Sequence, residues 1–262
     1  MNTDNMSILG LTIDYGPYGW LENYDPNWTP NTTDAQGRRY RFGQQAQIAL
    51  WNLVQLANAI YPLVAEAEPL ERSLHIYDET YESDWQNMMA QKLGLRAFET
   101  SDRELVSELF EVLALVETDM TLFFRGLAQV ESSSATPESI DDQRLMAPLL
   151  NAYYDSAERT EESKRRMSAW IHRYIARVNR DGREDHERSA AMDTINPKYV
   201  FRNYLAQLAI DRVEEGDFSM VHDLLDVLRR PYDEHPGKDA YAEKRPDWAR
   251  HRAGCSMLSC SS

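Results

Sequence analysis

Apolar residues recur at steps of three and four between residues 43 and 230, and this periodicity constrains the fold more than any other feature. In the first such segment, Leu50, Leu53, Leu56 and Ile60 share one face. That spacing is typical of an amphipathic helix. We expect the helix to stop at Pro62, since proline lacks the amide that continues a helix. The chain is therefore predicted to be mainly α-helical.

Local signals predict where later helices begin and end. Gly94 is expected to end the second helix, because glycine adopts the left-handed conformation of a C-cap. Ser101 and Glu104 have the spacing of a capping box, in which the two side chains satisfy the first amides of a helix. Asn196 before Pro197 predicts a further helix start, with proline in its favoured first position.

The predicted organisation is a single lobe over residues 1–262. The chain between residues 17 and 41 is rich in Pro, Gly, Asn and Asp, which favour turns. A short apolar run near the start predicts a small β element. The segments are a chemistry-bearing stretch over 1–16, with the β element at 6–14, a loop over 17–42, a helical body over 43–230 and an extended tail over 231–262.

The formal charge of −15 excludes two classes of partner. Nucleic acid and anionic membrane surfaces both require clustered Lys and Arg. No apolar run approaches the roughly 20 residues of a membrane span. The six histidines do not pair at metal-ligand spacings. We therefore expect neither nucleic acid nor a membrane as a partner.

The two cysteines, Cys255 and Cys260, both lie in the last eight residues. Two cysteines make neither a disulfide framework nor, without nearby histidines, a zinc site. A reduced cytoplasmic compartment is the default. We expect both thiols to be exposed and reactive, which makes them candidates for a redox role, with an inert tail as the alternative.

Large aromatic residues in the helical body are expected to pack rather than to bind a cofactor. Trp51, Trp170, Tyr153 and Tyr154 are predicted to lie in the core or at its edge, because aromatic side chains dominate burial.

Polar residues of the first sixteen positions carry the chemistry. Asp4 and Asn5 are adjacent, an apolar run follows, and Asp14 then precedes Tyr15 and Gly16. A protein-kinase catalytic segment has this order of parts, in which an Asn and the Asp of an Asp-aromatic-Gly triplet hold magnesium at nucleotide phosphates. One carboxylate and one amide suffice, because magnesium leaves most of its shell to water and phosphate.

The sequence of this segment closely resembles the active-site segment of the selenoprotein O family. It reads Asn-Thr-Asp-Asn-Met-Ser-Ile-Leu-Gly-Leu-Thr-Ile-Asp-Tyr-Gly-Pro-Tyr-Gly. The resemblance continues through residues 39–45, 51–53 and 196–205. It reaches the terminal Cys260-Ser-Ser, where many family members carry selenocysteine in place of the cysteine. The resemblance covers the whole chain.

The resemblance implies a kinase-like fold, with this chain as its C-terminal lobe, and transfer of AMP from ATP to Ser, Thr or Tyr hydroxyls of proteins with release of pyrophosphate. Asn5 and Asp14 correspond to the ligands of magnesium, with manganese as an alternative ion. Asp14 also lies at the ATP, and Asp4 corresponds to the proposed proton acceptor. The implied partners are ATP and protein substrates that bear hydroxyl side chains.

Two departures from the family pattern qualify these expectations. Family members have a lobe before this segment, with a glycine-rich loop, a phosphate-contacting lysine and several arginines. We therefore expect the chain to begin inside the catalytic loop and to be inactive in isolation. The kinase pattern would also place its catalytic Asp one residue before Met1, so Asp4 is not in the usual position of a kinase base.

Three functions remain open from the residues. The first is the adenylyltransferase, the second a kinase-like phosphotransferase that uses the same metal ligands on the γ-phosphate, and the third a catalytically incomplete helical binding fragment. The expected location is cytoplasmic for a bacterial protein and mitochondrial for a eukaryotic one, and the truncated start prevents a choice between them.

Overall fold

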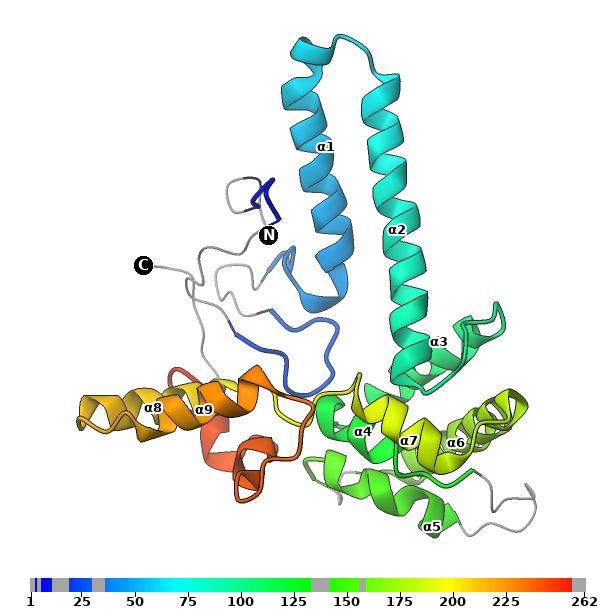
Figure 1. Ribbon diagram of the computed structural model, residues 1–262, viewed down its shortest axis with the longest axis vertical. Coiled ribbons are helices and arrows are strands. Elements are labelled where there is room, and N and C mark those ends of the chain that lie inside the picture. The colour runs from blue at the N-terminus through cyan, green and yellow to red at the C-terminus, as the bar shows by residue number, and fades with distance from the viewer. Residues whose placement is uncertain are drawn as a thin grey trace. The chain divides into compact units, whose positions relative to one another are not determined.

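The structure is a computed structural model that describes residues 3, 6–10, 19–29, 36–132, 142–155 and 159–255. Helices dominate these residues, which confirms the predicted mainly α-helical class, and no β-sheet occurs among them (Figure 1). The α-helices are α1 (Gln45–Val64), α2 (Glu68–Lys92), α3 (Asp102–Leu113), α4 (Met120–Leu127), α5 (Asp142–Met146), α6 (Glu161–Asp181), α7 (Asp185–Asp193), α8 (Asn203–Glu214) and α9 (Ser219–Arg229). Short 3-10 helices are η2 (Phe42–Gln44), η3 (Ala147–Ala152), η5 (Asp239–Ala242) and η6 (Asp247–His251).

The chain groups into two compact units. Unit 1 comprises Met1–Leu21, Asp25–Gln86 and His251–Ser262, and unit 2 comprises Glu22–Tyr24 and Asn87–Arg250. The single lobe over residues 1–262 stays a prediction.

Residues 6–10 form a turn, so the predicted β element is wrong for its described part. The backbone amides of Leu9 and Gly10 donate to the Oγ and the carbonyl oxygen of Ser7, at 3.2 and 3.1 Å. Gly10 has a φ of +69°, which is left-handed and incompatible with a strand. Ser7 and Gly10 thus override the β tendency of their apolar neighbours. The rest of the element, residues 11–14, lies outside the described residues.

In unit 1 the loop before α1 folds back on itself. The amides of Phe42 and Gly43 donate to the carbonyl oxygens of Trp28 and Pro26, both at 2.9 Å. The helix α1 does not stop at Pro62, as the sequence predicts, but continues to Val64. Proline has no backbone N–H, so position 62 donates no helical hydrogen bond. So close to the end of the helix, the loss of this one hydrogen bond is tolerated.

The core of unit 2 forms around Trp170 on α6, as its aromatic character predicts. This side chain is fully buried, donates its indole N–H to the carbonyl oxygen of Leu105 at 2.8 Å and stacks on Tyr174 at 5.3 Å between ring centroids. Tyr153 is also buried. Arg177 of α6 binds both carboxylate oxygens of buried Asp102, at 2.7 and 3.1 Å, which ties α6 to the start of α3.

The predicted capping box at Ser101 does not form. Ser101 has helical backbone angles and makes no side-chain cap bond. The Asp102 side chain instead faces the preceding loop and α6: its Oδ2 accepts the amide of Glu99 at 2.8 Å, and its carboxylate binds Arg177.

Asn196 does not start a helix either, and α8 begins at Asn203. The buried Asn196 side chain donates to the carbonyl oxygen of Lys92 and accepts from its Nζ, both at 3.0 Å. Lys92 is the last residue of α2, so Asn196 satisfies the end of a helix that lies 104 residues earlier.

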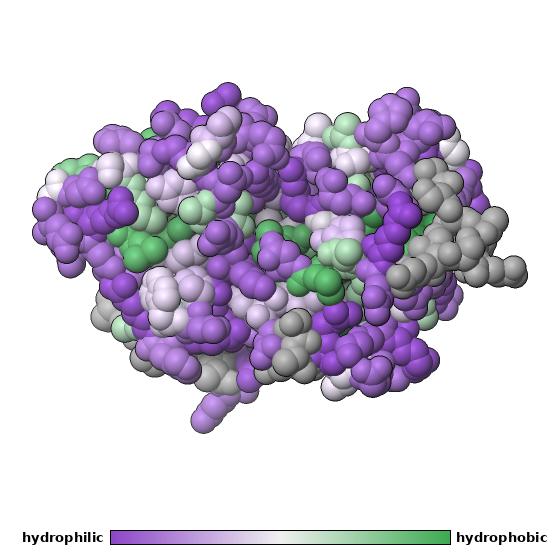
Figure 2. Space-filling model, turned by 90° about the horizontal axis from the view of Figure 1, so that it is seen from below, coloured by the Kyte–Doolittle hydropathy of each residue, from purple (hydrophilic) through white to green (hydrophobic). Residues whose placement is uncertain are grey.

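None of the described helices has the length and apolar character that crossing a bilayer requires. The face shown in Figure 2 is mostly hydrophilic, with small, separate hydrophobic groups among the polar side chains.

Gly94 ends α2 as predicted. It has a φ of +70°, and the following amide, that of Leu95, donates to Ala90 at 2.8 Å. A Cβ at this position would lie 2.7 Å from Cγ of Arg188 and 2.8 Å from Sδ of Met192. Both the backbone angle and the close packing therefore require glycine.

We expect Gly94→Ala to lower the free energy of unfolding by about 1–3 kcal/mol more than Gly182→Ala does, because it adds overpacking to backbone strain. Gly182 is the matched control, since it has a φ of +60° at the end of α6 and open space around its Cα. Urea unfolding of both variants measures the difference, and equal losses would contradict the packing argument.

Candidate functional site

The predicted metal and catalytic residues Asp4, Asn5 and Asp14 lie outside the described residues, and so does Cys260. The described neighbour of Asn5 is Met6, which α1 holds: Nδ2 of Asn52 lies 2.9 Å from the Met6 sulfur. Asn52 is 4% exposed, and its Oδ1 has no hydrogen-bond partner among the described residues. Asn52 thus anchors the residue that follows Asp4-Asn5.

In unit 2, Asp119 lies at the centre of a buried charge cluster. Its Oδ2 is 2.5 Å from Nη1 of Arg202, and neither side chain is more than 1% exposed. Its Oδ1 accepts the amide of Leu122 at 2.9 Å, which caps α4. The hydroxyl of Tyr154 donates to Oδ2 at 3.3 Å. One carboxylate therefore joins the start of α4 to Arg202, the residue directly before α8.

A short segment that begins at Glu22 pairs with the backbone beside Asp119. The amide of Tyr24 donates to the carbonyl oxygen of Thr118 at 2.9 Å, and the amide of Met120 donates to that of Glu22 at 3.4 Å. The carboxylate of Glu22 is buried and lies 3.3 Å from Arg245. The chain is thus fixed eight residues after Asp14.

Glu117 contributes a third carboxylate to the cluster and pairs with two arginines. It accepts from Arg245 at 2.7 Å and from Arg250 at 2.9 Å. Both guanidiniums also lie 5.2 Å from the ring centroid of Tyr154, within the range of cation–π attraction. Burial raises the pKa of the Tyr154 hydroxyl, so this group remains protonated and donates to Asp119.

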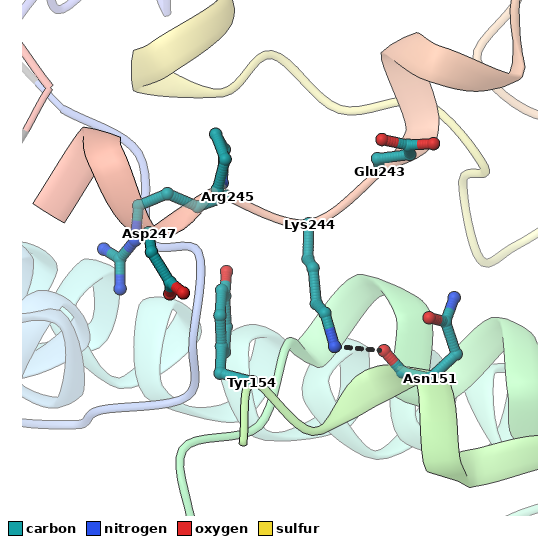
Figure 3. A pocket seen from close by; sticks show the side chains of 7 residues that line it. Asn151, Tyr154, Glu243, Lys244, Arg245 and Asp247 are labelled. Atoms are coloured by element: carbon teal, nitrogen blue, oxygen red, sulfur yellow. Dashed lines mark hydrogen bonds between the residues drawn. The ribbon is translucent and has the colours of Figure 1, made fainter. Parts of the chain in front are cut away.

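A cavity of about 420 Å³ opens beside this cluster in unit 2 (Figure 3). It is lined by Asn151, Tyr154 and residues 243–247. The Nζ of Lys244 points across it and donates to the carbonyl oxygens of Asn151, at 3.3 Å, and Tyr153. Because Lys244 and Arg245 are bound to oxygens of the protein, the cavity does not offer them to phosphate. Within the described part of the chain, no group of three His, Cys, Asp or Glu could hold a metal ion.

Comparison with known proteins decides the family. Residues 1–229 match the family described as "Protein adenylyltransferase SelO". The chain belongs to this family. It is 58% identical to the "Protein nucleotidyltransferase YdiU" of Rhodopirellula baltica, 54% identical to that of Azoarcus sp. and 53% identical to that of Aromatoleum aromaticum. Each alignment covers 100% of this chain and, in the same order, 49%, 49% and 48% of the relative. The chain therefore spans about half the length of these SelO relatives.

The sequence points to the active-site segment of a SelO protein but misses the charge cluster beside Asp119. Arg202 lies inside a stretch that carries the family resemblance, and Asp119 is an acid directly before the apolar stretch of α4, which is an N-cap signal. Glu22 is a lone charge between apolar and aromatic residues. Asp119 and Arg202 lie 83 positions apart, and Glu22 is farther still from Arg245, so no local pattern reveals these pairs.

Cys255 is 2% exposed, so the prediction of an exposed thiol is wrong for this residue. A turn places it inside unit 1: Gly254 has a φ of +80°, and the amide of Cys255 donates to the carbonyl oxygen of Arg252 at 3.1 Å. The redox role of Cys255 and Cys260 stays a prediction.

Arg202→Met should lower the free energy of unfolding by about 3–5 kcal/mol, because it leaves the Asp119 carboxylate buried without its countercharge. The control is Arg72→Met, which breaks a 2.7 Å pair with Glu68 whose side chains are 66% and 83% exposed. We expect that variant to lose no more than about 1 kcal/mol. Denaturant unfolding compares the two, and similar losses would show that the buried pair has no special role.

The stability of the fold is expected to depend on pH through the carboxyl group of Glu22. Burial raises the pKa of this carboxyl above its ordinary value of 4.5, and the opposing attraction of Arg245 and Arg202 is smaller. The folded chain then holds the proton more tightly than the unfolded chain does. Glu22 therefore stabilises the fold below pH 4.5 and loses this contribution as the pH rises through its raised pKa.

Glu22→Gln removes this titration. We expect the free energy of unfolding of the native chain, minus that of the variant, to fall as the pH rises above 4.5. Urea unfolding at several pH values measures it, with Glu66→Gln at an exposed position as the control. A difference that stays level or increases with pH would rule out a raised pKa.

Proposed function

We propose that this chain carries the metal-binding part of a protein adenylyltransferase, which transfers AMP from ATP to Ser, Thr or Tyr hydroxyls of proteins. The observation that carries the proposal is the match of residues 1–229 to the SelO family, since this range includes Asp4, Asn5 and Asp14. The name of the relatives, protein nucleotidyltransferase, supports the same reaction class. A kinase-like C-terminal lobe is the fold that we propose for the helical body.

Asn5 and Asp14 would hold magnesium, or manganese in its place. An amide oxygen and a carboxylate are the oxygen donors that magnesium takes, with water and phosphate in the other positions. When bound, the ion supplies neutralisation of the charge on the ATP phosphates. The anchor that Asn52 makes on Met6 supports this assignment, because it fixes the residue next to Asn5 on the rigid helix α1.

Asp4 would accept the proton of the substrate hydroxyl. The hydroxyl oxygen attacks the α-phosphorus, a new phosphorus–oxygen bond forms, and the bond to the β-phosphate breaks so that pyrophosphate leaves. Positioning and electrostatics supply most of the rate in reactions of this kind. The pairing of Glu22 beside Asp119 would position the chain that follows Asp14.

The chain alone should bind ATP weakly and transfer no AMP. The resemblance assigns the phosphate-contacting loop, the lysine and the arginines to the other half of the family sequence. The relatives named above are bacterial, which supports a bacterial, cytoplasmic protein and gives no support to a mitochondrial one.

The test joins this chain to the half of the Rhodopirellula baltica relative that it does not match. With ATP labelled at the α-phosphate, protein substrates should acquire label, and Asp14→Ala should lower the rate by at least about 100-fold because one carboxylate carries most of the charge of the site. Asn5→Ala should also cause a large loss. Asp84→Ala, at an exposed position of α2, is the control and should leave the rate unchanged.

Unchanged AMP transfer in Asp14→Ala would contradict the metal assignment. The same reaction is run with ATP labelled at the γ-phosphate. Transfer of the γ-label without the α-label would identify a phosphotransferase and overturn the proposed reaction. Incorporation of neither label by the joined protein would favour a helical binding fragment.

A further inference from the structure

The helix α1 has a composition that is unusual for this chain. Its twenty residues, Gln45–Val64, include no Asp, Glu, Lys or Arg, although 27% of the whole chain is charged and its net charge is −15. Apolar residues occur on all sides of the helix. A helix of that kind is normally buried on all sides.

In the structure α1 is largely uncovered. Its buried residues are Ile48, Ala49 and Asn52. Trp51, which the sequence predicts to lie in the core or at its edge, is 41% exposed. The large apolar side chains that reach 40% exposure or more on α1 are Trp51, Leu56, Tyr61, Leu63 and Val64, and Leu63 reaches 86%.

The neighbouring helix α2 does not supply the missing cover. The two helices run side by side in opposite directions, and the hydroxyl of Tyr77 on α2 donates to the carbonyl oxygen of Ala46 on α1 at 3.1 Å (Figure 1). Unlike α1, α2 has the charged residues of an ordinary surface helix, among them Glu71, Arg72 and Asp78. The exposed apolar side chains of α2, Ile76, Tyr81 and Met88, stand among these charged residues, whereas those of α1 have no charged neighbour on their own helix.

We propose that the exposed apolar face of α1 is a docking surface for the half of the SelO family chain that this chain does not match. The relatives are about twice as long as this chain, and they match it over its full length, so α1 lies inside the shared region. The helix carries no charge of its own, and the Arg39 guanidinium lies 4.2 Å from the ring centroid of Trp51 at one end of the face. The remainder of the face suits an apolar segment of polypeptide, because a charged partner would lose its hydration without an ionic partner on α1. Covering these five side chains removes their apolar surface from water, which is the main favourable contribution to association.

Amide hydrogen exchange in two existing proteins tests this proposal directly. One is this chain, and the other is the complete Rhodopirellula baltica relative. We expect the segment that aligns with α1 to exchange at least about tenfold more slowly in the relative, since burial suppresses local opening. The segment that aligns with α8 serves as the internal control and should exchange at similar rates in both. Equal exchange of the α1 segment in the two proteins would overturn the proposal.

A variant separates docking from a local effect. In this chain joined to the relative's unmatched half, Leu63→Glu should lower the melting temperature by several degrees, since it places a charge in the contact. In this chain alone it should have no effect, because Leu63 is already in water. The matched control is Ile210→Glu on α8, 50% exposed, which should leave both proteins unchanged.

Two other occupants are outcomes of the same experiments. If this chain alone sediments as a dimer that Leu63→Glu dissociates, and the relative shows no extra protection, α1 is covered by a second copy and the proposal fails. It fails equally if the α1 amides are protected only when phosphatidylcholine vesicles are added.

Discussion

The buried ion pair between Asp119 and Arg202 is the interaction on which the described part of unit 2 depends. Asp119 also caps α4 and accepts from Tyr154, and the backbone beside it pairs with the segment that begins at Glu22. Charges with so little exposure are stable only when they are paired, so the parts that meet at Asp119 form together or not at all. The structural contacts of Asp119 thus help to determine where the chain after Asp14 is attached.

One anchor lies within the proposed catalytic segment, and a second follows the segment in sequence. Asn52 holds Met6 within unit 1, and the pairing of Glu22 and Tyr24 holds the later residues within unit 2. Glu22 is an acid in a buried position, and burial raises its pKa, so the anchor is weaker than a fully satisfied ion pair. In the proposed enzyme the first anchor would hold Met6 against α1, and the second would hold the chain after Asp14 against the residues that begin α4.

Local sequence predicts the helices well and predicts their partners poorly. The helices and the C-cap at Gly94 follow from interactions within a few residues, and the structure confirms both. Where the predicted helix starts at Ser101 and Asn196 fail, the nearby side chains make long-range contacts: Asp102 binds Arg177, 75 positions away, and Asn196 binds Lys92, 104 positions away. The candidate site divides in the same way. Its acids are visible as a motif, whereas the pairing of Asp119 with Arg202 requires the fold.

Paramagnetic broadening by manganese tests the central claim, that Asn5 and Asp14 form the metal site, most directly. Substoichiometric manganese–ATP is added to isotope-labelled chain, and loss of amide signals reports which residues lie near the ion, even when binding is weak. The account predicts that signals of Asn5, Asp14 and their sequence neighbours disappear first, and that Asp14→Ala abolishes this selectivity. Broadening that is centred on the cavity lined by Tyr154 and Lys244, or spread evenly over exposed carboxylates, would contradict it.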